Sequence, residues 1–159
     1  MTTMGSPADL TVERVEAAFA ALASGDRDQI RRYWAEDLRF EIPGHHSHAG
    51  WYGSLDEFLE FLGVIGRLSG GSYRAENLVV TVNAEAGYSV DVNTNWATRA
   101  GSDGGSGSPY DVLDVTAAHV LRWHDGRVVE GRGALLGDGA ATSMLWWSSV
   151  DRDGSRRAS

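Results

Sequence analysis

The sequence predicts an α+β fold in which three N-terminal helices pack in a curved antiparallel sheet. Two observations predict it. Apolar residues recur at helical spacing through much of residues 11–69, and four later segments have the composition of strands separated by turns. The 159 residues suit one domain. We expect a flexible leader at 1–9, a single domain at 10–150 and a disordered tail at 151–159.

The three helices are predicted from their apolar spacing and their capping residues. The first runs from residue 11 and ends at Ser24-Gly25, a typical C-terminal signal. Asp26 can cap a second helix that includes Tyr33 and Trp34. Ser54 and Glu57 form a capping box for a third helix, which ends at glycines 70–71.

The strands are predicted from alternation and from the turns that bound them. A short strand, "LRFEI", stops at Pro43-Gly44 and is followed by a loop rich in histidine, glycine and aromatic residues. The remaining strands are expected at 73–84, 87–99, 111–124 and 127–136. The segment "ATSMLWWSSV" that follows is expected to form a short helix or strand over an apolar surface.

Composition excludes several classes of function. The net charge of −8 argues against nucleic acid and anionic membranes as partners, because both attract basic surfaces. The absence of cysteine excludes disulfides, thiolate nucleophiles and cysteine-ligated zinc. No apolar run reaches the length of a signal peptide or a membrane span, so we expect a cytoplasmic protein.

The last predicted hairpin carries charged residues where apolar ones are expected. Its turn at residues 125–126 is Asp-Gly, typical of a two-residue type I′ turn, which would pair Leu121 with Glu130 and His119 with Arg132. Side chains alternate between the two faces of a strand, so this register places His119, Glu130 and Arg132 together on the core face.

Two interpretations of this triad remain open. Ionised groups are costly to bury unless they are paired, so Glu130 and Arg132 could form a structural ion pair or lie near the end of the sheet. Alternatively, the sheet encloses a cavity that His119, Glu130 and Arg132 line. A carboxylate, an imidazole and a guanidinium there can share acid, base and anion-stabilising roles.

Two motifs resemble the SnoaL-like branch of the nuclear transport factor 2-like superfamily. The first is a strand ending in Pro-Gly, followed by Ala-Gly-x-Tyr-x-Gly before a helix: Pro43, Gly44, Ala49, Gly50, Tyr52 and Gly53. The second is a strand that turns at Asp-Gly and continues to a glutamate: Asp125, Gly126, Val128 and Glu130. The resemblance covers about residues 9–138.

The resemblance implies a cone-shaped fold whose concave sheet encloses an apolar pocket. Members include polyketide cyclases, steroid isomerases, epoxide hydrolases and non-catalytic binding modules, so the fold does not decide the function. The steroid isomerases' tyrosine and aspartate fall on Ala18 and Ile42, which argues against their mechanism. The aspartate usual in SnoaL-like cyclases falls on Leu136, although a small bulge could bring in Asp138. The resemblance therefore offers Glu130 or Asp138 as the acid/base, and we favour Glu130.

Aromatic residues and histidines supply the candidate contacts to a substrate. They are His46, His48, Trp51, Tyr52, Tyr33, Trp34, Trp96 and Trp123. A metal site on histidines 45, 46 and 48 would need a further ligand and a second shell, and nothing in the spacing demands them, so we expect no metal. We also expect no cofactor. Alternation places Trp96 on the core face and Asp91, Asn93 and Asn95 on the outer face, where such folds often form homodimers.

The leading hypothesis is a cofactor-independent enzyme of secondary metabolism that cyclises, isomerises or opens an epoxide in a hydrophobic, polyketide-like molecule. Glu130 would exchange a proton with the substrate, His119 would orient or share that proton, and Arg132 would stabilise negative charge. The alternative is a module of the same fold that binds a small molecule without chemistry.

Overall fold

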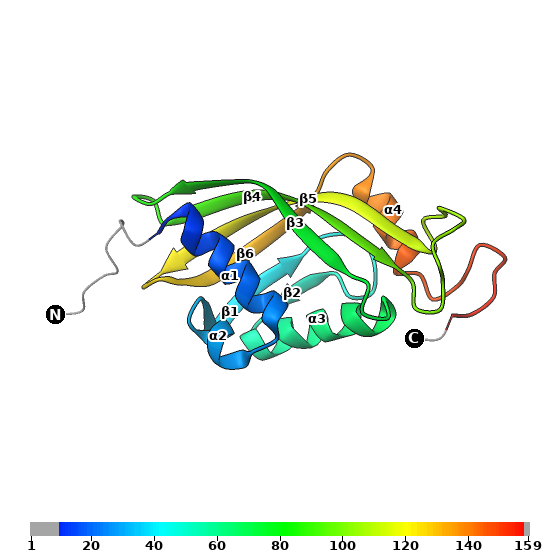
Figure 1. Cartoon of the computed structure of the whole chain (residues 1–159), viewed down its shortest axis with the longest axis horizontal. Helices are drawn as coiled ribbons and strands as arrows, with labels where there is room; N and C mark the ends of the chain where they lie inside the picture. Colours follow the sequence, from blue (N-terminus) through cyan, green and yellow to red (C-terminus); the bar gives the residue numbers. More distant parts are fainter. Residues whose placement is uncertain (1–9, 158–159) are drawn as a thin grey trace.

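The computed structural model describes residues 10–157, which form one six-stranded sheet and four helices (Figure 1). The strand order is β2-β1-β6-β5-β4-β3. The strands are β1 (Trp34–Ile42), β2 (Gly50–Tyr52), β3 (Arg74–Asn83), β4 (Tyr88–Thr98), β5 (Val112–His124) and β6 (Arg127–Leu135). The predicted α+β class with a curved sheet is confirmed, and β3 to β6 lie within one or two residues of their predicted positions. β2 lies in the segment that was predicted to be a loop.

Three helices lie in the N-terminal half. α1 (Val12–Ser24) begins at Thr11, whose hydroxyl accepts a hydrogen bond from the Arg14 backbone, and ends at Gly25 in the left-handed conformation. α3 (Leu55–Leu68) begins at Ser54, as predicted, and buries four residues of its apolar face. α1 packs against β3, and α3 packs against β1 and β2.

The second helix, α2 (Arg27–Arg31), is shorter than predicted. Asp26 caps it, but Tyr33 and Trp34 lie beyond its end, and Trp34 is the first residue of β1. The physical reason is burial: the Trp34 side chain is completely enclosed, and its indole N–H donates to the Ala18 carbonyl at 2.9 Å. The Trp34 ring reaches the core because the chain ends α2 at Arg31 and continues into β1.

A fourth helix, α4 (Gly139–Trp146), follows the sheet and packs against β5. The helical content therefore differs from the predicted three N-terminal helices. Within residues 10–157, no helix is long and apolar enough to cross a membrane.

Two long-range contacts close the fold. β1 pairs in parallel with β6. The prediction of a wholly antiparallel sheet is therefore wrong at this pair. The Arg14 side chain of α1 donates two hydrogen bonds, of 2.9 and 2.7 Å, to the Gly126 carbonyl in the β5–β6 turn. Asp125 and Gly126 both have positive φ angles, as the predicted type I′ turn requires.

The chain after α4 folds back on the domain. Val150 and Arg156 form an isolated antiparallel bridge, and the Arg157 guanidinium contacts Asp111 and Asp151. We call residues 150–157 the C-terminal strap. The predicted domain bounds of 10–150 stay a prediction, and the predicted leader at 1–9 lies outside the described residues.

Candidate active site

A β-bulge in β6 decides which side chains face the interior. The register is Trp123 with Val128 and then Arg122 with Glu130, so Val129 is an extra residue on β6. One extra residue moves every following side chain to the other face. The predicted pairing of Leu121 with Glu130 is therefore wrong, because Leu121 pairs with Gly131.

As a result, β6 presents glycines to the interior and charged residues to the outside. A Cβ at Gly131 would lie 2.3 Å from the Phe40 ring. Arg132, with 60% of its side chain exposed, forms an ion pair of 3.0 Å with Glu41. Glu130 lies between Arg122 of β5 and Arg39 of β1 in the register. Glu130 and Arg132 therefore lie on the outer face of the sheet, and the structure does not bring them together with His119.

Asp138 also lies away from the interior. It is exposed and immediately precedes α4, and its side chain makes no capping hydrogen bond. The bulge in β6 occurs well before this residue and does not bring it to the inner face.

The inner face of β4 is polar, contrary to the prediction. Asp91, Asn93 and Asn95 are 0, 1 and 8% exposed, and Trp96 points outward with the Arg74 guanidinium over its ring. The prediction that placed Trp96 inside was wrong because the polar side chains bond one another: Asn95 donates to Asn93 at 2.6 Å, and Asn93 donates to Asp91 Oδ2 at 2.7 Å. Asp91 Oδ1 is buried and has no hydrogen-bond partner among residues 10–157. Buried polar groups are tolerated when they bond one another in this way.

His119 of β5 completes this row. It pairs with Asp91 in the β4–β5 register, and its Nδ1 lies 2.9 Å from Asp91 Oδ2. The Asn93 amide nitrogen also lies 3.1 Å from Nδ1. Paired with an ionised Asp91 carboxylate, which only accepts hydrogen bonds, Nδ1 carries the proton and Nε2 has a lone pair. Among residues 10–157, Nε2 has no hydrogen-bond partner in the structure.

Aromatic rings enclose the His119 imidazole without sealing it off. Phe19 stacks on it and Phe40 meets it edge-on, each with a centroid distance of 5.7 Å. The side chain remains 21% exposed, whereas Asp91 is fully buried. The arrangement is a fixed imidazole, oriented by a buried carboxylate and accessible on one side.

Tyr73 ends the polar row. Its hydroxyl donates to Asn95 Oδ1, and burial raises the pKa of this phenol to about 12. Tyr73 is therefore a hydrogen-bond donor throughout the neutral range. The structure thus joins Tyr73, Asn95, Asn93, Asp91 and His119 into one hydrogen-bonded chain across the inner face, which we call the polar row.

The predicted aromatic contacts fall into three groups. Trp34 and Trp123 are core residues, and the Trp123 indole N–H donates to Ser89. Trp51 and Trp96 lie on the outer surface beneath arginine side chains. Tyr33 is half-buried under Arg14 at the end of α1.

The remaining candidates lie in the histidine loop. His46 stacks on Trp147 at 4.5 Å, His48 lies 5.2 Å from the same ring, and Tyr52 donates to the His48 carbonyl at 2.7 Å. Burial, and then the charge of His48, lower the His46 pKa to about 4. Across residues 10–157, no group of three or more histidine, aspartate or glutamate side chains could hold a metal ion.

Comparison with known proteins shows the family to which this chain belongs. A family model described as a SnoaL-like domain matches residues 15–131. The chain belongs to the SnoaL-like family. An uncharacterized protein of Mycobacterium tuberculosis H37Rv is 28% identical over 138 residues, which are 87% of this chain and 97% of the relative.

Solved structures agree on the fold. Bal32a, from a soil-derived mobile gene cassette, is 25% identical with a TM-score of 0.73, covering 86% of this chain and 95% of Bal32a. A candidate SnoaL-like polyketide cyclase from Jannaschia sp. CCS1 is 21% identical with a TM-score of 0.62, covering 84% and 90% of the two chains. The predicted membership of the SnoaL-like branch is confirmed.

Proposed function

We propose that this SnoaL-like protein catalyses proton transfer on a hydrophobic, polyketide-like small molecule, as a cyclase or isomerase of secondary metabolism. His119 acts as the general base and acid, and Asp91 orients it. The observation that carries the proposal is the 2.9 Å contact between His119 Nδ1 and the buried Asp91 carboxylate. Of the sequence-predicted catalytic residues, the proposal keeps His119 and gives no proton transfer to Glu130, Arg132 or Asp138.

The chemistry follows from the state of the imidazole. His119 Nε2 accepts a proton from a carbon next to a substrate carbonyl, and the electron pair moves onto the carbonyl oxygen as an enolate. In a cyclisation, the enolate carbon attacks a second carbonyl of the same molecule. A carbon–carbon bond forms, and the new alkoxide takes the proton back from Nε2. In an isomerisation, the proton returns to a different carbon.

Asp91 contributes by position and charge. It holds the imidazole in the tautomer that leaves Nε2 as the acceptor, and it stabilises the imidazolium that forms. Asn93 donates to Asp91 at 2.7 Å, and Asn95 donates to Asn93 at 2.6 Å and so holds it in place. A base on a rigid sheet, supported by such a row, favours catalysis by positioning.

The surroundings of His119 support an apolar, flat substrate. Phe19 and Phe40 both present their rings to the imidazole, and aromatic rings bind planar apolar molecules well. The Jannaschia neighbour's description as a candidate polyketide cyclase is consistent with this class of substrate.

The test measures proton exchange directly. Polycyclic aryl ketones such as 1-tetralone are incubated with the protein in D₂O, and deuterium incorporation is followed by mass spectrometry. We expect His119→Gln to lower the exchange rate by about 10²- to 10⁴-fold, the usual contribution of a general base. His124→Gln is the matched control, because His124 is on the same strand but exposed at the turn.

Asp91→Asn separates positioning from proton transfer. It should lower the exchange rate at least about tenfold and shift the His119 tautomer, as seen in ¹⁵N chemical shifts of the imidazole. Deuterium incorporation that is no faster with the protein than in buffer alone would contradict the enzymatic proposal. Saturable binding without exchange would instead support a non-catalytic binding module.

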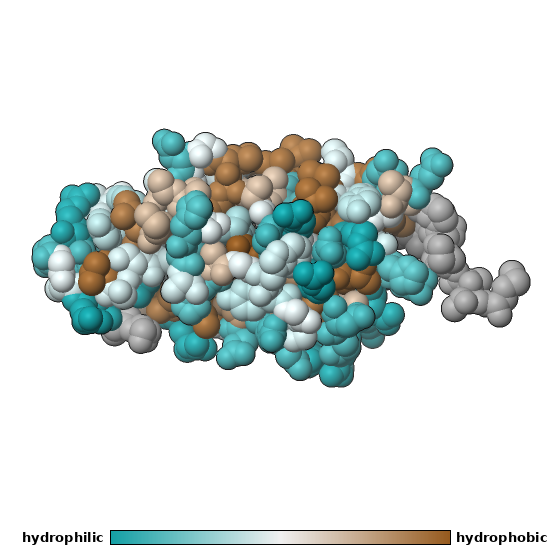
Figure 2. Space-filling model, turned by 180° about the vertical axis from the view of Figure 1, so that it is seen from behind, coloured by the Kyte–Doolittle hydropathy of each residue, from teal (hydrophilic) through white to brown (hydrophobic). Residues whose placement is uncertain are grey.

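We further infer a cytoplasmic homodimer that forms through the outer face of the sheet. Val79, Val90 and Val120 are 53, 39 and 42% exposed there, and Val90 pairs directly with Val120. Figure 2 shows hydrophobic side chains gathered along the upper part of the molecule in that view. Contiguous apolar surface of this kind is typical of protein interfaces.

A further inference from the structure

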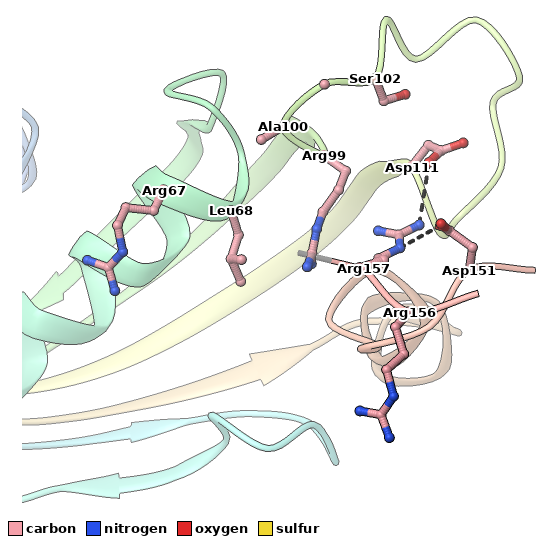
Figure 3. A pocket seen from close by; sticks show the side chains of 10 residues that line it. Arg67, Leu68, Arg99, Ala100, Ser102, Asp111, Asp151, Arg156 and Arg157 are labelled. Carbon is pink, nitrogen blue, oxygen red and sulfur yellow. Dashed lines mark hydrogen bonds and ion pairs between the residues drawn. The ribbon is translucent and has the colours of Figure 1, made fainter. Parts of the chain in front are cut away.

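A pocket of about 440 Å³ lies where the end of α3, the two ends of the β4–β5 loop and the C-terminal strap meet (Figure 3). Four arginines and two aspartates line it. They are Arg67, Arg99, Arg156, Arg157, Asp111 and Asp151. In a chain with a net charge of −8, this is a local excess of positive charge.

Both aspartates are bound to a single arginine. Arg157 Nε donates to Asp151 at 2.6 Å, and Arg157 Nη2 lies 3.4 Å from Asp111. The Arg157 side chain is only 5% exposed, and its remaining nitrogen, Nη1, is buried without a hydrogen-bond partner among residues 10–157. Unpaired buried donors are rare and costly, and this one belongs to an arginine that two aspartates hold at the wall of the pocket.

Two of the other arginines, Arg67 and Arg156, bring charge that the aspartates do not neutralise. Arg99 is 8% exposed and donates to the Trp146 carbonyl at 3.0 Å. Burial, and then the neighbouring charge of Arg157, lower the Arg99 pKa. Arg67 and Arg156 are exposed, and within the described part of the chain they form no ion pair.

This pocket is separate from the polar row. Arg99 follows the end of β4, and Asp91 lies near its beginning. At about 3.3 Å per residue, the two are roughly 25 Å apart along the strand. A small substrate that contacts His119 does not reach Arg99.

We propose that this pocket is an independent binding site for a small organic oxyanion, a carboxylate or a phosphate ester. The planar guanidinium groups suit carboxylate and phosphate oxygens, which accept paired hydrogen bonds. The volume exceeds that of a bare anion and is within the range of small-molecule sites. Leu68 and Ala100 supply apolar contact for the organic part.

The test is calorimetric titration of the full chain with benzoate and with phenyl phosphate at constant ionic strength, with phenol as the uncharged probe. We expect saturable binding of at least one anion, and none of phenol. The stronger of the two anions identifies the class of head group. Arg67→Gln and Arg156→Gln should each weaken binding at least about tenfold, and both residues are exposed, so the variants should fold.

Arg152→Gln is the matched control, because Arg152 has the same charge on the same strap but does not line the pocket. It should bind like the unsubstituted protein. Equal loss in all three variants would mean non-specific attraction and would overturn the proposal, as would the absence of saturable binding. His119→Gln should leave anion affinity unchanged, which separates this site from the proposed catalytic function.

Discussion

The imidazole of His46 lies flat against the Trp147 indole, with an interplanar angle of 9°. Its Nδ1 accepts a hydrogen bond of 3.2 Å from the His48 backbone N–H, which only the neutral ring with its proton on Nε2 can do. Charging this ring therefore breaks a bond and leaves a cation largely removed from water. Both effects agree with the lowered pKa of about 4.

This residue makes the stability of the fold sensitive to acid. Between its ordinary pKa of 6.5 and about 4, the unfolded chain binds a proton at His46 that the folded chain does not. The contribution of His46 to the free energy of unfolding should therefore be fully present above pH 6.5. It should decrease as the pH falls toward 4 and change no further below that. His46→Gln should flatten this part of the profile, measured by urea unfolding at a series of pH values. His45→Gln, the exposed neighbour, should leave the slope unchanged, and an equal flattening in that variant would contradict the assignment.

At the scale of elements, the β6 bulge and the two glycines that follow it act together, because they let β1 side chains lie close to the β6 backbone. Gly131 lets the Phe40 ring lie against the β6 backbone, and a Cβ there would lie 2.3 and 2.5 Å from two ring carbons. Phe40 in turn contacts His119, Trp34 and Phe58. The bulge places glycine, rather than a charged side chain, beneath this aromatic contact.

Gly131→Ala should therefore lower the free energy of unfolding by about 1–3 kcal/mol, the usual cost of overpacking. Gly66→Ala is the same change inside α3, where nothing lies within 4 Å, and it should raise stability by about 0.5–1 kcal/mol. Urea unfolding of both variants is the measurement. A Gly131→Ala protein as stable as the unsubstituted one would show that Phe40 does not approach the strand this closely.

Sequence reasoning found the elements whose signals are local. The cap at Ser54, the stop at Gly25 and the Asp125-Gly126 turn are each set by a few neighbouring residues, and all three are where they were predicted. Local signals could not predict which side chains of β6 point to the interior. The bulge in β6 brings Gly131 and Gly133 against Phe40 of β1 and Pro43, which follows β1, and these residues are distant in sequence.

The polar row was missed for a related reason. β4 alternates two sets, Ser-Asp-Asn-Asn and Tyr-Val-Val-Thr-Trp, and hydropathy assigns the second set to the core. The opposite assignment holds because Asp91, His119 and the two asparagines are hydrogen-bonded to one another along and across the strands. Pairing of Asp91 with His119 across two predicted strands was the signal that could have revealed the site.

At the scale of the whole molecule, the reversed facing leaves apolar side chains on the outer sheet. Val90→Glu should convert the inferred homodimer to a monomer, because a carboxylate beside Val120 and Val92 cannot be buried without a partner. Sedimentation velocity over a range of protein concentrations measures this. Val12→Glu, the same change at an exposed valine of α1 and away from the outer face of the sheet, is the control and should leave the dimer intact. A protein that sediments as a monomer at every concentration would rule out the dimer.

The hydrogen bonds from Arg14 to the Gly126 carbonyl join residues 112 apart in the chain. A ribosome releases the first helix long before the turn that anchors it exists, and the parallel neighbour of β1 emerges even later. Early fragments therefore lack partners for their apolar surfaces, which makes nascent chains dependent on protection from aggregation. Contacts so distant also favour slow folding, over milliseconds to seconds, once synthesis is complete.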